Sequence, residues 1–241
     1  MHSLSIIVPA YNEEQRLPPT LTQLLSWASQ RSWKWFEILV VDDGSRDRTA
    51  EVVRRFAQQH PCIRLVSNPG NRGKGYAVRH GMLCAQGDWR LFTDSDLSTP
   101  IEEFDKLMQA AARAQADVAF GSRALDRSLV SVHQPAFREA SGRFFNFVMR
   151  LIMRLPHRDT QCGFKLYSAA AAKEIFSRQQ IDGFGFDVED LFLARKLGFV
   201  AVEVPVRWAN VEGTRVSLAS GLRAFGELFL IRWNQLRGRY R

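Results

Sequence analysis

The stretch "FEILVVDDGSRDRTAEVVRRFAQQH", residues 36–60, contains one complete copy of the pattern that decides the fold. Its first part, 36–43, is an apolar run typical of a buried strand, and its last part has the apolar spacing of a helix. Either Ser45 or Asp47 can cap that helix at its start. A buried strand that leads directly into a helix predicts an α/β unit.

The same alternation of strand and helix extends over the first half of the chain. Apolar runs predict four more strands, at 4–10, 62–68, 89–94 and 117–123. Helical spacing predicts three more helices, one after Pro18-Pro19, one within 73–87 and one within 100–114. Strands rich in Val, Ile and Leu, with helices between them, predict an α/β fold with a mostly parallel central sheet and helices on both faces.

The second half of the chain has a different organisation. Residues 124–136 are predicted as a loop, 162–168 and 200–208 as strands, and 188–198 as a helix. Two segments, 137–155 and 218–241, are predicted as amphipathic helices with basic faces. No linker or internal repeat separates these parts. The sequence therefore predicts one domain over 1–217, with halves 1–123 and 124–217, and a helical tail at 218–241.

The composition limits the classes of protein to consider. The chain has 241 residues, a formal charge of +8 and 46% apolar residues, which is an ordinary globular composition with a basic surplus. That surplus favours an anionic partner, which can be nucleic acid, a membrane surface or a phosphorylated substrate. Three cysteines without a C-x-x-C pair indicate a reducing compartment and no structural zinc site. No apolar stretch reaches the roughly 18 residues needed to cross a bilayer.

Polar residues follow four of the predicted strands. They are Tyr11, Asn12 and Glu13 after the first strand, Asp42 to Ser45 after the second, Asp94 and Asp96 after the fourth, and Ser122 and Arg123 after the fifth. The carboxyl ends of parallel strands meet at one edge of the sheet, where ligands bind in such folds. We therefore expect these motifs to form one site.

The chemistry of these motifs admits more than one interpretation. Asp94 and Asp96 suit a hard divalent cation that also takes phosphate oxygens, although a turn with a capping Asp before Pro100 would need the same residues. At a strand end of a parallel sheet we favour the cation. Asp42 can bind a nucleotide, while Asp43 can do so as well or belong to the turn.

The glycine-rich segment "GNRGKGYAVRHG" (70–81) is not a P-loop, because Gly75 stands where that motif has Ser or Thr. Arg72 and Lys74, at a helix start, can still face phosphates, or they can belong to a solvated basic loop. No G-x-G-x-x-G follows the first strand, so the sequence does not support a dinucleotide-dependent oxidoreductase.

Five stretches in this order, "SIIVPAYNEE", "ILVVDDGSRDRT", "NPGNRGKGYAVRHG", "FTDSDLSTP" and "GSR", resemble the inverting family 2 glycosyltransferases, which have a GT-A fold. The stretches "RDTQCGFKLYS" (158–168), "GFDVEDLFLARKLG" (185–198) and "VPVRWANVEGTRV" (204–216) resemble the polyprenyl-phosphate sugar transferases. The resemblance covers about residues 4–217. It is greatest for the dolichyl-phosphate β-glucosyltransferases, with the dolichyl-phosphate mannose synthases as related enzymes.

The resemblance implies a role for each matching residue. Asp94 and Asp96 would bind Mg²⁺ or Mn²⁺ at the donor diphosphate, and "CGFK" (162–165) would shape the sugar and acceptor pocket. The nucleotide-sugar would contact Pro9, Ala10, Tyr11, Glu13, Asp42, Asp43, Lys74, Asp94 and Ser95. The acceptor phosphate would contact Arg123, Arg138, Lys165 and Arg215. Arg215 departs from the Lys that relatives often carry there, and Arg is not a geometric copy of Lys.

The acceptor decides whether a catalytic base is needed. A lipid phosphate has a second pKa of about 6 and is already ionised near neutral pH, so it needs cations rather than a base. A hydroxyl acceptor would need a carboxylate, for which Asp187, Glu189 and Asp190 are the candidates. The alternative for these residues is an acidic helix start that favours the helix dipole.

The sequence thus predicts a metal-dependent hexosyltransferase that moves glucose from UDP-glucose to a polyprenyl phosphate. We expect it to lie peripherally on the cytoplasmic face of a membrane, through its basic amphipathic helices. The alternatives are GDP-mannose as donor, a sugar or protein hydroxyl as acceptor, or a nucleotide-sugar sensor without catalysis. A nucleic-acid-binding protein is a distant alternative, because no module signature of that class is present. The sequence leaves the oligomeric state open.

Overall fold

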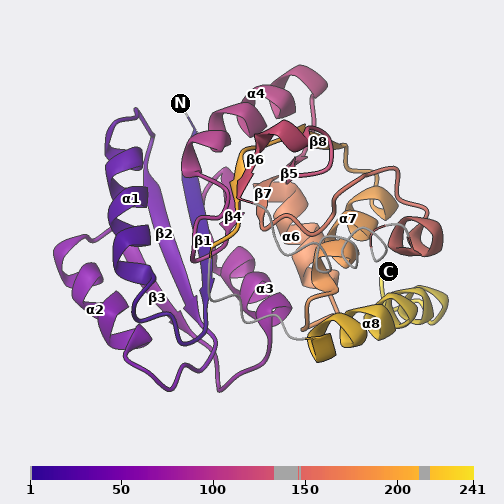
Figure 1. The fold of residues 1–241 in the computed structure, drawn as a ribbon, viewed down its shortest axis with the longest axis horizontal. Coiled ribbons are helices and arrows are strands. Elements are labelled where there is room, and N and C mark those ends of the chain that lie inside the picture. The colour runs from indigo at the N-terminus through magenta and orange to yellow at the C-terminus, as the bar shows by residue number, and fades with distance from the viewer. Residues whose placement is uncertain (1, 133–145, 147, 212–217) are drawn as a thin grey trace.

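The computed structural model describes residues 2–132, 146, 148–211 and 218–241, and within 218–222 the backbone only. Figure 1 shows a central twisted sheet with helices on both faces. The sheet has seven strands in the order β3-β2-β1-β4-β7-β5-β8. A separate pair, β6 and β9, lies apart from it.

The strands are β1 (Leu4–Ala10), β2 (Phe36–Asp42), β3 (Ile63–Ser67), β4 (Trp89–Thr93), β5 (Val118–Ser122), β6 (Val130–Val132), β7 (Phe164–Ser168), β8 (Ala201–Pro205) and β9 (Trp208–Ala209). The α-helices are α1 (Leu17–Ser29), α2 (Thr49–Gln59), α3 (Lys74–Cys84), α4 (Phe104–Ala114), α6 (Ala169–Arg178), α7 (Phe186–Lys196) and α8 (Leu218–Leu236). Two 3-10 helices are η1 (Ile101–Glu103) and η2 (Arg127–Leu129), and residues 148–153 are also helical.

Alternation along the strands divides the core into two layers. Ile6 and Val8 of β1 belong to the layer under α1 and α4, whereas Ile7 between them belongs to the layer under α3, α6 and α7. Successive side chains of a strand point to opposite faces, so a strand without polar interruption is buried on both sides. The predicted α/β fold with helices on both faces is therefore confirmed.

The order of the strands contains one feature that the sequence did not predict. β7 lies between β4 and β5 and is antiparallel to both, with Thr93 opposite Phe164 and Phe120 opposite Lys165. The other neighbouring pairs in this sheet are parallel. The second half of the chain thus returns into the centre of the sheet, and the start of β7 lies beside the end of β4.

Two other predictions about the second half need correction, and one helix there was missed. Residues 130–132 are not loop, because they form β6, which pairs in parallel with β9. The strand predicted at 200–208 is divided into β8 and β9, since Val206 turns inward and is fully buried between them. Helix α6 was not predicted. Of the helix predicted at 137–155, most of the first part lies outside the described residues.

Helix α8 packs its inner face on the same core layer as α7. Leu228 and Ile231 are fully buried there, and Tyr240, beyond the helix end, is buried with them. Its outer face exposes Phe229 and Trp233, as discussed below. Within the described residues, no helix combines the length and apolarity needed to cross a bilayer.

Candidate active site

The ends of β1, β2, β4 and β5 bring the predicted motifs to one edge of the sheet. Ala10 at the end of β1 pairs with Asp42 at the end of β2, and the Asp43 amide donates to the Ala10 carbonyl at 2.9 Å. Asp94 follows β4 directly, and Ser122 is the last residue of β5. These strands are parallel, so their carboxyl ends form a common floor for a ligand.

Asp94 and Lys74 form the ion pair at the centre of this edge. The Lys74 ammonium lies 2.7 Å from Asp94 Oδ1, and both side chains remain partly exposed. The backbone of Asp94 donates to the Gly163 carbonyl at 3.2 Å. A Cβ on Gly163 would lie 2.5 Å from Asp94 Cγ, so a side chain there would displace the carboxylate. The glycine that precedes β7 thus makes room for Asp94.

The charges around this pair are unbalanced. Burial raises the pKa of Asp94, the Lys74 ammonium lowers it, and the negative charges of Asp96 and Asp187 raise it again, with a net upward shift. Burial lowers the pKa of Lys74, but Asp94 and Asp187 outweigh that effect and leave it raised. Asp94, Asp96 and Asp187 therefore all act on the Lys74 ammonium, and Asp187 is also paired with Lys165. Within the described part of the chain, no three acidic, His or Cys side chains stand together as a ready metal site.

Asp96 takes part in the turn after β4. Its Oδ1 accepts from the Ser98 amide at 3.0 Å, which is the local role that a turn residue has. The side chain is half-buried, and its charge reaches both Asp94 and Lys74. The metal role of Asp96 stays a prediction that this position permits.

Asp43 is fully occupied within the protein. Its carboxylate accepts from the Arg72 amide at 3.1 Å, from the Gly73 amide at 2.8 Å and from Asn68 Nδ2 at 2.7 Å. These bonds hold the loop that leads into Lys74, so Asp43 has a structural role there, and its predicted contact with the nucleotide stays a prediction. Asp42 is buried and accepts from the Ser45 amide at 3.1 Å, and its predicted contact with the nucleotide stays a prediction.

The loop after β1 is tied to the loop after β2. The Asn12 amide donates to Ser45 Oγ at 2.8 Å, and the Glu13 amide donates to Thr49 Oγ1 at 2.7 Å. Asn12 has a φ of 55°, a left-handed conformation that Asn tolerates better than most residues. Thr20 Oγ1 donates to the Ser95 carbonyl at 2.6 Å and links α1 to the turn after β4. The predicted nucleotide contacts of Pro9, Ala10, Tyr11, Glu13 and Ser95 stay predictions.

Arg123 is held by Asp159, a residue that sequence reasoning did not single out. Arg123 Nε and Nη2 donate to the two carboxylate oxygens of Asp159 at 2.7 and 2.9 Å, and the Arg123 amide donates at 3.0 Å. Although burial raises the pKa of Asp159, the Arg123 guanidinium lowers it below its usual range. Its one signal in the sequence is its place in "RDTQCGFKLYS", one of the stretches that carry the family resemblance. The Arg123 side chain is 28% exposed, and its guanidinium lies over the Trp208 ring, 5.4 Å from the ring centroid. Its predicted contact with the acceptor phosphate stays a prediction.

Lys165 was predicted to meet the acceptor phosphate, and the structure corrects this. Its ammonium is fully buried and lies 2.8 Å from Asp187 Oδ1 and 2.9 Å from Asp190 Oδ2. The Tyr167 hydroxyl donates to Asp190 Oδ2 at 2.6 Å. A buried ammonium needs such partners, because an unpaired charge in the protein interior is unstable. Lys165 therefore holds the Asp187 carboxylate from inside the protein. Asp190 is also fully buried, so it cannot reach an acceptor.

Glu189 is also engaged in the interior. Its carboxylate accepts from the Gln180 amide at 3.0 Å, from the Ile181 amide at 2.8 Å and from the Tyr240 hydroxyl. Burial raises the pKa of Glu189 to about 7, and these hydrogen bonds lower it less than burial raises it. The Glu189 side chain is fully buried, so its carboxylate cannot contact a substrate as the predicted base would. Arg138 and Arg215 lie outside the described residues.

The chain matches the family model described as "Glycosyl transferase family 2" over residues 5–176. It is 38% identical to a dolichyl-phosphate beta-glucosyltransferase of Drosophila melanogaster, over 99% of this chain and 77% of that protein. The identity to the dolichyl-phosphate beta-glucosyltransferase of Homo sapiens is 34%, with the same two coverages.

Solved structures show the same fold. Glucosyl-3-phosphoglycerate synthase from Mycobacterium tuberculosis, in complex with Mn²⁺, UDP and glucosyl-3-phosphoglycerate, superposes with a TM-score of 0.69 at 19% identity, over 95% of this chain and 80% of that one. Mannosyl-3-phosphoglycerate synthase from Rubrobacter xylanophilus gives 0.71 at 16% identity, over 99% and 75%. With relatives above 30% identity over nearly its whole length, this chain belongs to glycosyl transferase family 2.

Proposed function

We propose that this chain transfers glucose from UDP-glucose to a dolichyl or related polyprenyl phosphate, with inversion at the anomeric carbon. The observation that carries the proposal is the Lys74–Asp94 pair at the sheet edge, with Asp96 and Asp187 adding negative charge around it. The names of relatives above 30% identity support glucose as the sugar and a lipid phosphate as the acceptor.

The donor half of the site suits a nucleoside diphosphate as leaving group. Asp94 and Asp96 would hold Mg²⁺ or Mn²⁺, which neutralises charge that develops on the diphosphate oxygens. Mg²⁺ in particular is held by one or two carboxylates together with substrate phosphates. Lys74 stays charged in this environment and can donate to a phosphate oxygen when the diphosphate arrives. The loop that Asp43 orders keeps Lys74 at this place.

The acceptor half supports a phosphate nucleophile. An oxygen of the lipid phosphate forms the new bond to the anomeric carbon while the bond to the UDP oxygen breaks, and the electron pair leaves with UDP. The attacking phosphate is already ionised, so no proton has to be removed. The burial of Glu189 and Asp190 agrees with a reaction that uses neither of them as a base. Arg123, fixed by Asp159, can orient the phosphate.

The outer face of α8 supports a peripheral membrane location. Phe229, Leu230, Trp233 and Leu236 are between 51% and 81% exposed there, while the opposite face of the helix is buried in the core. One apolar face of α8 packs on the protein core, and the other is stable only against another apolar surface, such as a membrane. Helix α8 does not have the length and apolarity to cross a bilayer. An interfacial position, with these side chains at the level of the acyl chains, satisfies this requirement.

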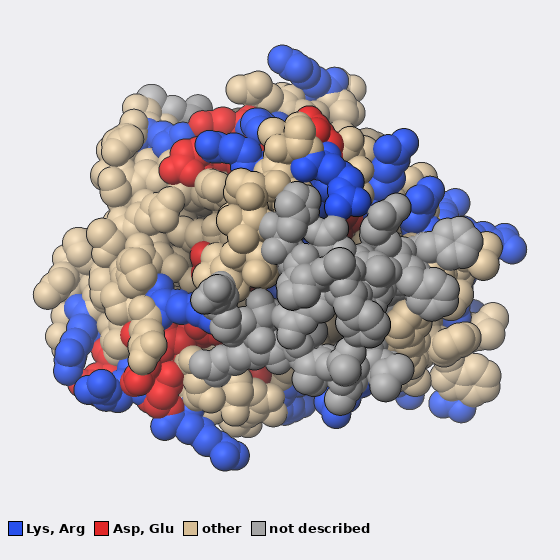
Figure 2. Space-filling view, viewed as in Figure 1, with Lys and Arg blue, Asp and Glu red and all other residues tan. Residues whose placement is uncertain are grey.

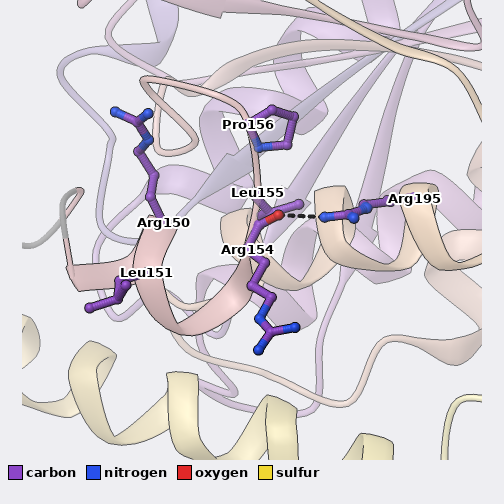
Figure 3. Close-up of a pocket in the computed structure, with 6 residues that line it drawn as sticks. All are labelled: Arg150, Leu151, Arg154, Leu155, Pro156 and Arg195. Atoms are coloured by element: carbon purple, nitrogen blue, oxygen red, sulfur yellow. Dashed lines mark hydrogen bonds between the residues drawn. The ribbon is translucent and has the colours of Figure 1, made fainter.

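A group of arginines lies beside α8 and fits anionic headgroups. Arg150, Arg154 and Arg195 line a depression of about 640 Å³ together with Leu151, Leu155 and Pro156 (Figure 3). Among the described residues, no carboxylate pairs with any of the three arginines. Figure 2 shows Lys and Arg side chains along the upper right edge of this view, where no Asp or Glu side chain is visible. The three cysteines are free, as is usual for proteins in a reducing compartment. This supports the cytoplasmic face as the side of the membrane.

The direct test is turnover by the purified chain with radiolabelled UDP-glucose, Mn²⁺ and a short polyprenyl phosphate in detergent. We expect a lipid-linked glucose, and neither GDP-mannose nor an acceptor without a phosphate should replace the substrates. Asp94→Asn should abolish the product, whereas Asp105→Asn, an exposed carboxylate on α4, should not. If product forms from GDP-mannose and not from UDP-glucose, the proposed donor is wrong. If turnover occurs without the lipid phosphate, the proposed acceptor is wrong.

A further inference from the structure

The segment between α6 and α7, residues 179–185, lies between the start of α3 and the inner face of α8. On the α3 side the Tyr76 amide donates to the Asp182 carbonyl at 3.2 Å, and Gln179 Nε2 donates to the Gly75 carbonyl at 3.0 Å. A Cβ on Gly75 would lie 2.6 Å from the Ile181 carbonyl oxygen. The first turn of α3, which carries Lys74, is therefore built directly on this segment.

Helix α8 holds the other side of the same segment through Glu227. Glu227 Oε2 accepts from the Gly185 amide at 2.6 Å, and Gly185 is the residue before α7. A Cβ on Gly183 would lie 2.9 Å from Glu227 Cδ, and a Cβ on Gly185 would lie 2.8 Å from Glu227 Cβ. The two glycines let the carboxylate lie against the backbone, and the Glu227 side chain is buried there.

The segment determines where two charged residues of the site stand. Lys74 begins α3, and Asp187 lies in the first turn of α7, two residues after Gly185. The Lys74 ammonium lowers the pKa of Asp94, and the Asp187 carboxylate raises it. A shift of 179–185 would move the ammonium and the Asp187 carboxylate relative to Asp94. The hydrogen bond from Gly185 to Glu227 thus connects α8 itself to this segment, and the bond from Tyr240, beyond the helix end, to Glu189 is a second link to it.

We propose that Glu227 is a positioning residue for the transferase site, which fixes the segment 179–185 and through it Lys74 and Asp187. It does not touch a substrate. The proposal rests on the proposed function for its kinetic consequence, but its structural part is independent of the substrate. The helix that exposes Phe229 and Trp233 on its outer face is, on its inner face, part of the framework of the active site.

The test compares three variants of the full chain. Glu227→Ala removes the acceptor, and Glu227→Gln keeps an oxygen for the Gly185 amide. Leu228→Ala opens a cavity on the same inner face of α8 and removes no hydrogen bond to the segment. We expect Glu227→Ala to raise the KM for UDP-glucose roughly tenfold, because a misplaced Lys74 weakens diphosphate binding. Glu227→Gln should restore most of the affinity. Leu228→Ala should lower the melting temperature and leave this KM close to that of the wild type.

Hydrogen exchange in the absence of substrate gives a second measurement. Amides of 180–187 and 74–78 should exchange faster in Glu227→Ala than in Leu228→Ala, when both are compared at equal distance below their melting temperatures. Equal exchange in the two variants, or a KM that is unchanged in Glu227→Ala, would overturn the proposal. If the wild type itself shows no turnover with UDP-glucose, the proposed function fails, and the exchange measurement still decides whether Glu227 holds the segment.

Discussion

Replacement of Gly163 by Ala tests whether the position of the Asp94 carboxylate is what the donor site depends on. Gly163 precedes β7, and the chain there lies beside the end of β4. No left-handed φ is required at this residue, so alanine is compatible with its backbone. The substitution adds one methyl group and changes no charge. Any effect on activity must therefore come from the space that the methyl group occupies.

The structure gives the size of the displacement. The new Cβ would lie 2.5 Å from Asp94 Cγ, while carbon atoms in van der Waals contact are about 3.5 Å apart or more. Strand β7 is paired on both edges, by β4 and by β5, and has little freedom to retreat. The carboxylate must then move by about 1 Å, and its 2.7 Å contact with Lys74 is lost or lengthened. A misplacement of that size reduces turnover by about 100-fold.

The assay measures kcat/KM for UDP-glucose at saturating polyprenyl phosphate, over a series of Mn²⁺ concentrations, with the melting temperature of each variant. Gly226→Ala is the matched control, because a Cβ there meets nothing within 4 Å and lies on the exposed side of α8. This control should gain about 0.5–1 kcal/mol in helix stability and keep full activity. A Gly163→Ala enzyme that folds normally and turns over within about threefold of the wild type would refute the reasoning.

Three further predictions follow from the buried charges and from α8. Lys165→Met leaves the buried carboxylates of Asp187 and Asp190 without their ammonium. The free energy of unfolding, measured in urea, should fall by about 3–5 kcal/mol. A fall below about 1 kcal/mol would contradict the buried network. The raised pKa of Glu189, about 7, means that its contribution to stability is full below its unfolded pKa, near 4.5, and is lost as the pH rises through about 7. Glu189→Gln should flatten the pH dependence of the melting temperature in that window, and an unchanged slope would show that Glu189 does not titrate there. Trp233→Ser should weaken sedimentation with vesicles that contain phosphatidylserine, while Leu83→Ser, on the exposed side of α3, should not, and equal binding would exclude α8 as the contact.

The first half of the fold was predictable because its signals are local. Each strand of 4–123 is an apolar run of a few residues, and each polar motif follows its strand within one to three positions. Parallel strands necessarily align their carboxyl ends, so convergence of Asp42 and Asp94 at one edge follows from the pattern alone. Helix α6 also had a local signal that was missed, since Ser168 caps a run of four alanines.

The second half was less predictable because its order depends on distant contacts. No local pattern within "CGFKLYS" indicates that this strand lies between β4 and β5 and is antiparallel to both. Strands β6 and β9, of three and two residues, are too short to show a periodicity, and each is a strand because it pairs with the other. Acidic residues in "DVED" suited either a base or a helix start, and their place in buried polar networks was not predicted. Their partners, Lys165 and Tyr240, decide among these, and they lie far along the chain.

The sequence by itself determined the α/β alternation and the edge of the sheet at which the polar motifs gather, and it predicted Asp94, Asp96 and Lys74 as residues of a site there. Periodicity and motif spacing carry that information, because they depend on near neighbours in the chain. Only the tertiary structure decided that Lys165, Glu189 and Asp190 are internal, since burial depends on which elements cover a side chain. It also showed that Gly163 makes room for Asp94 and that Glu227 of α8 holds the start of α7. Those contacts join segments that no local pattern connects.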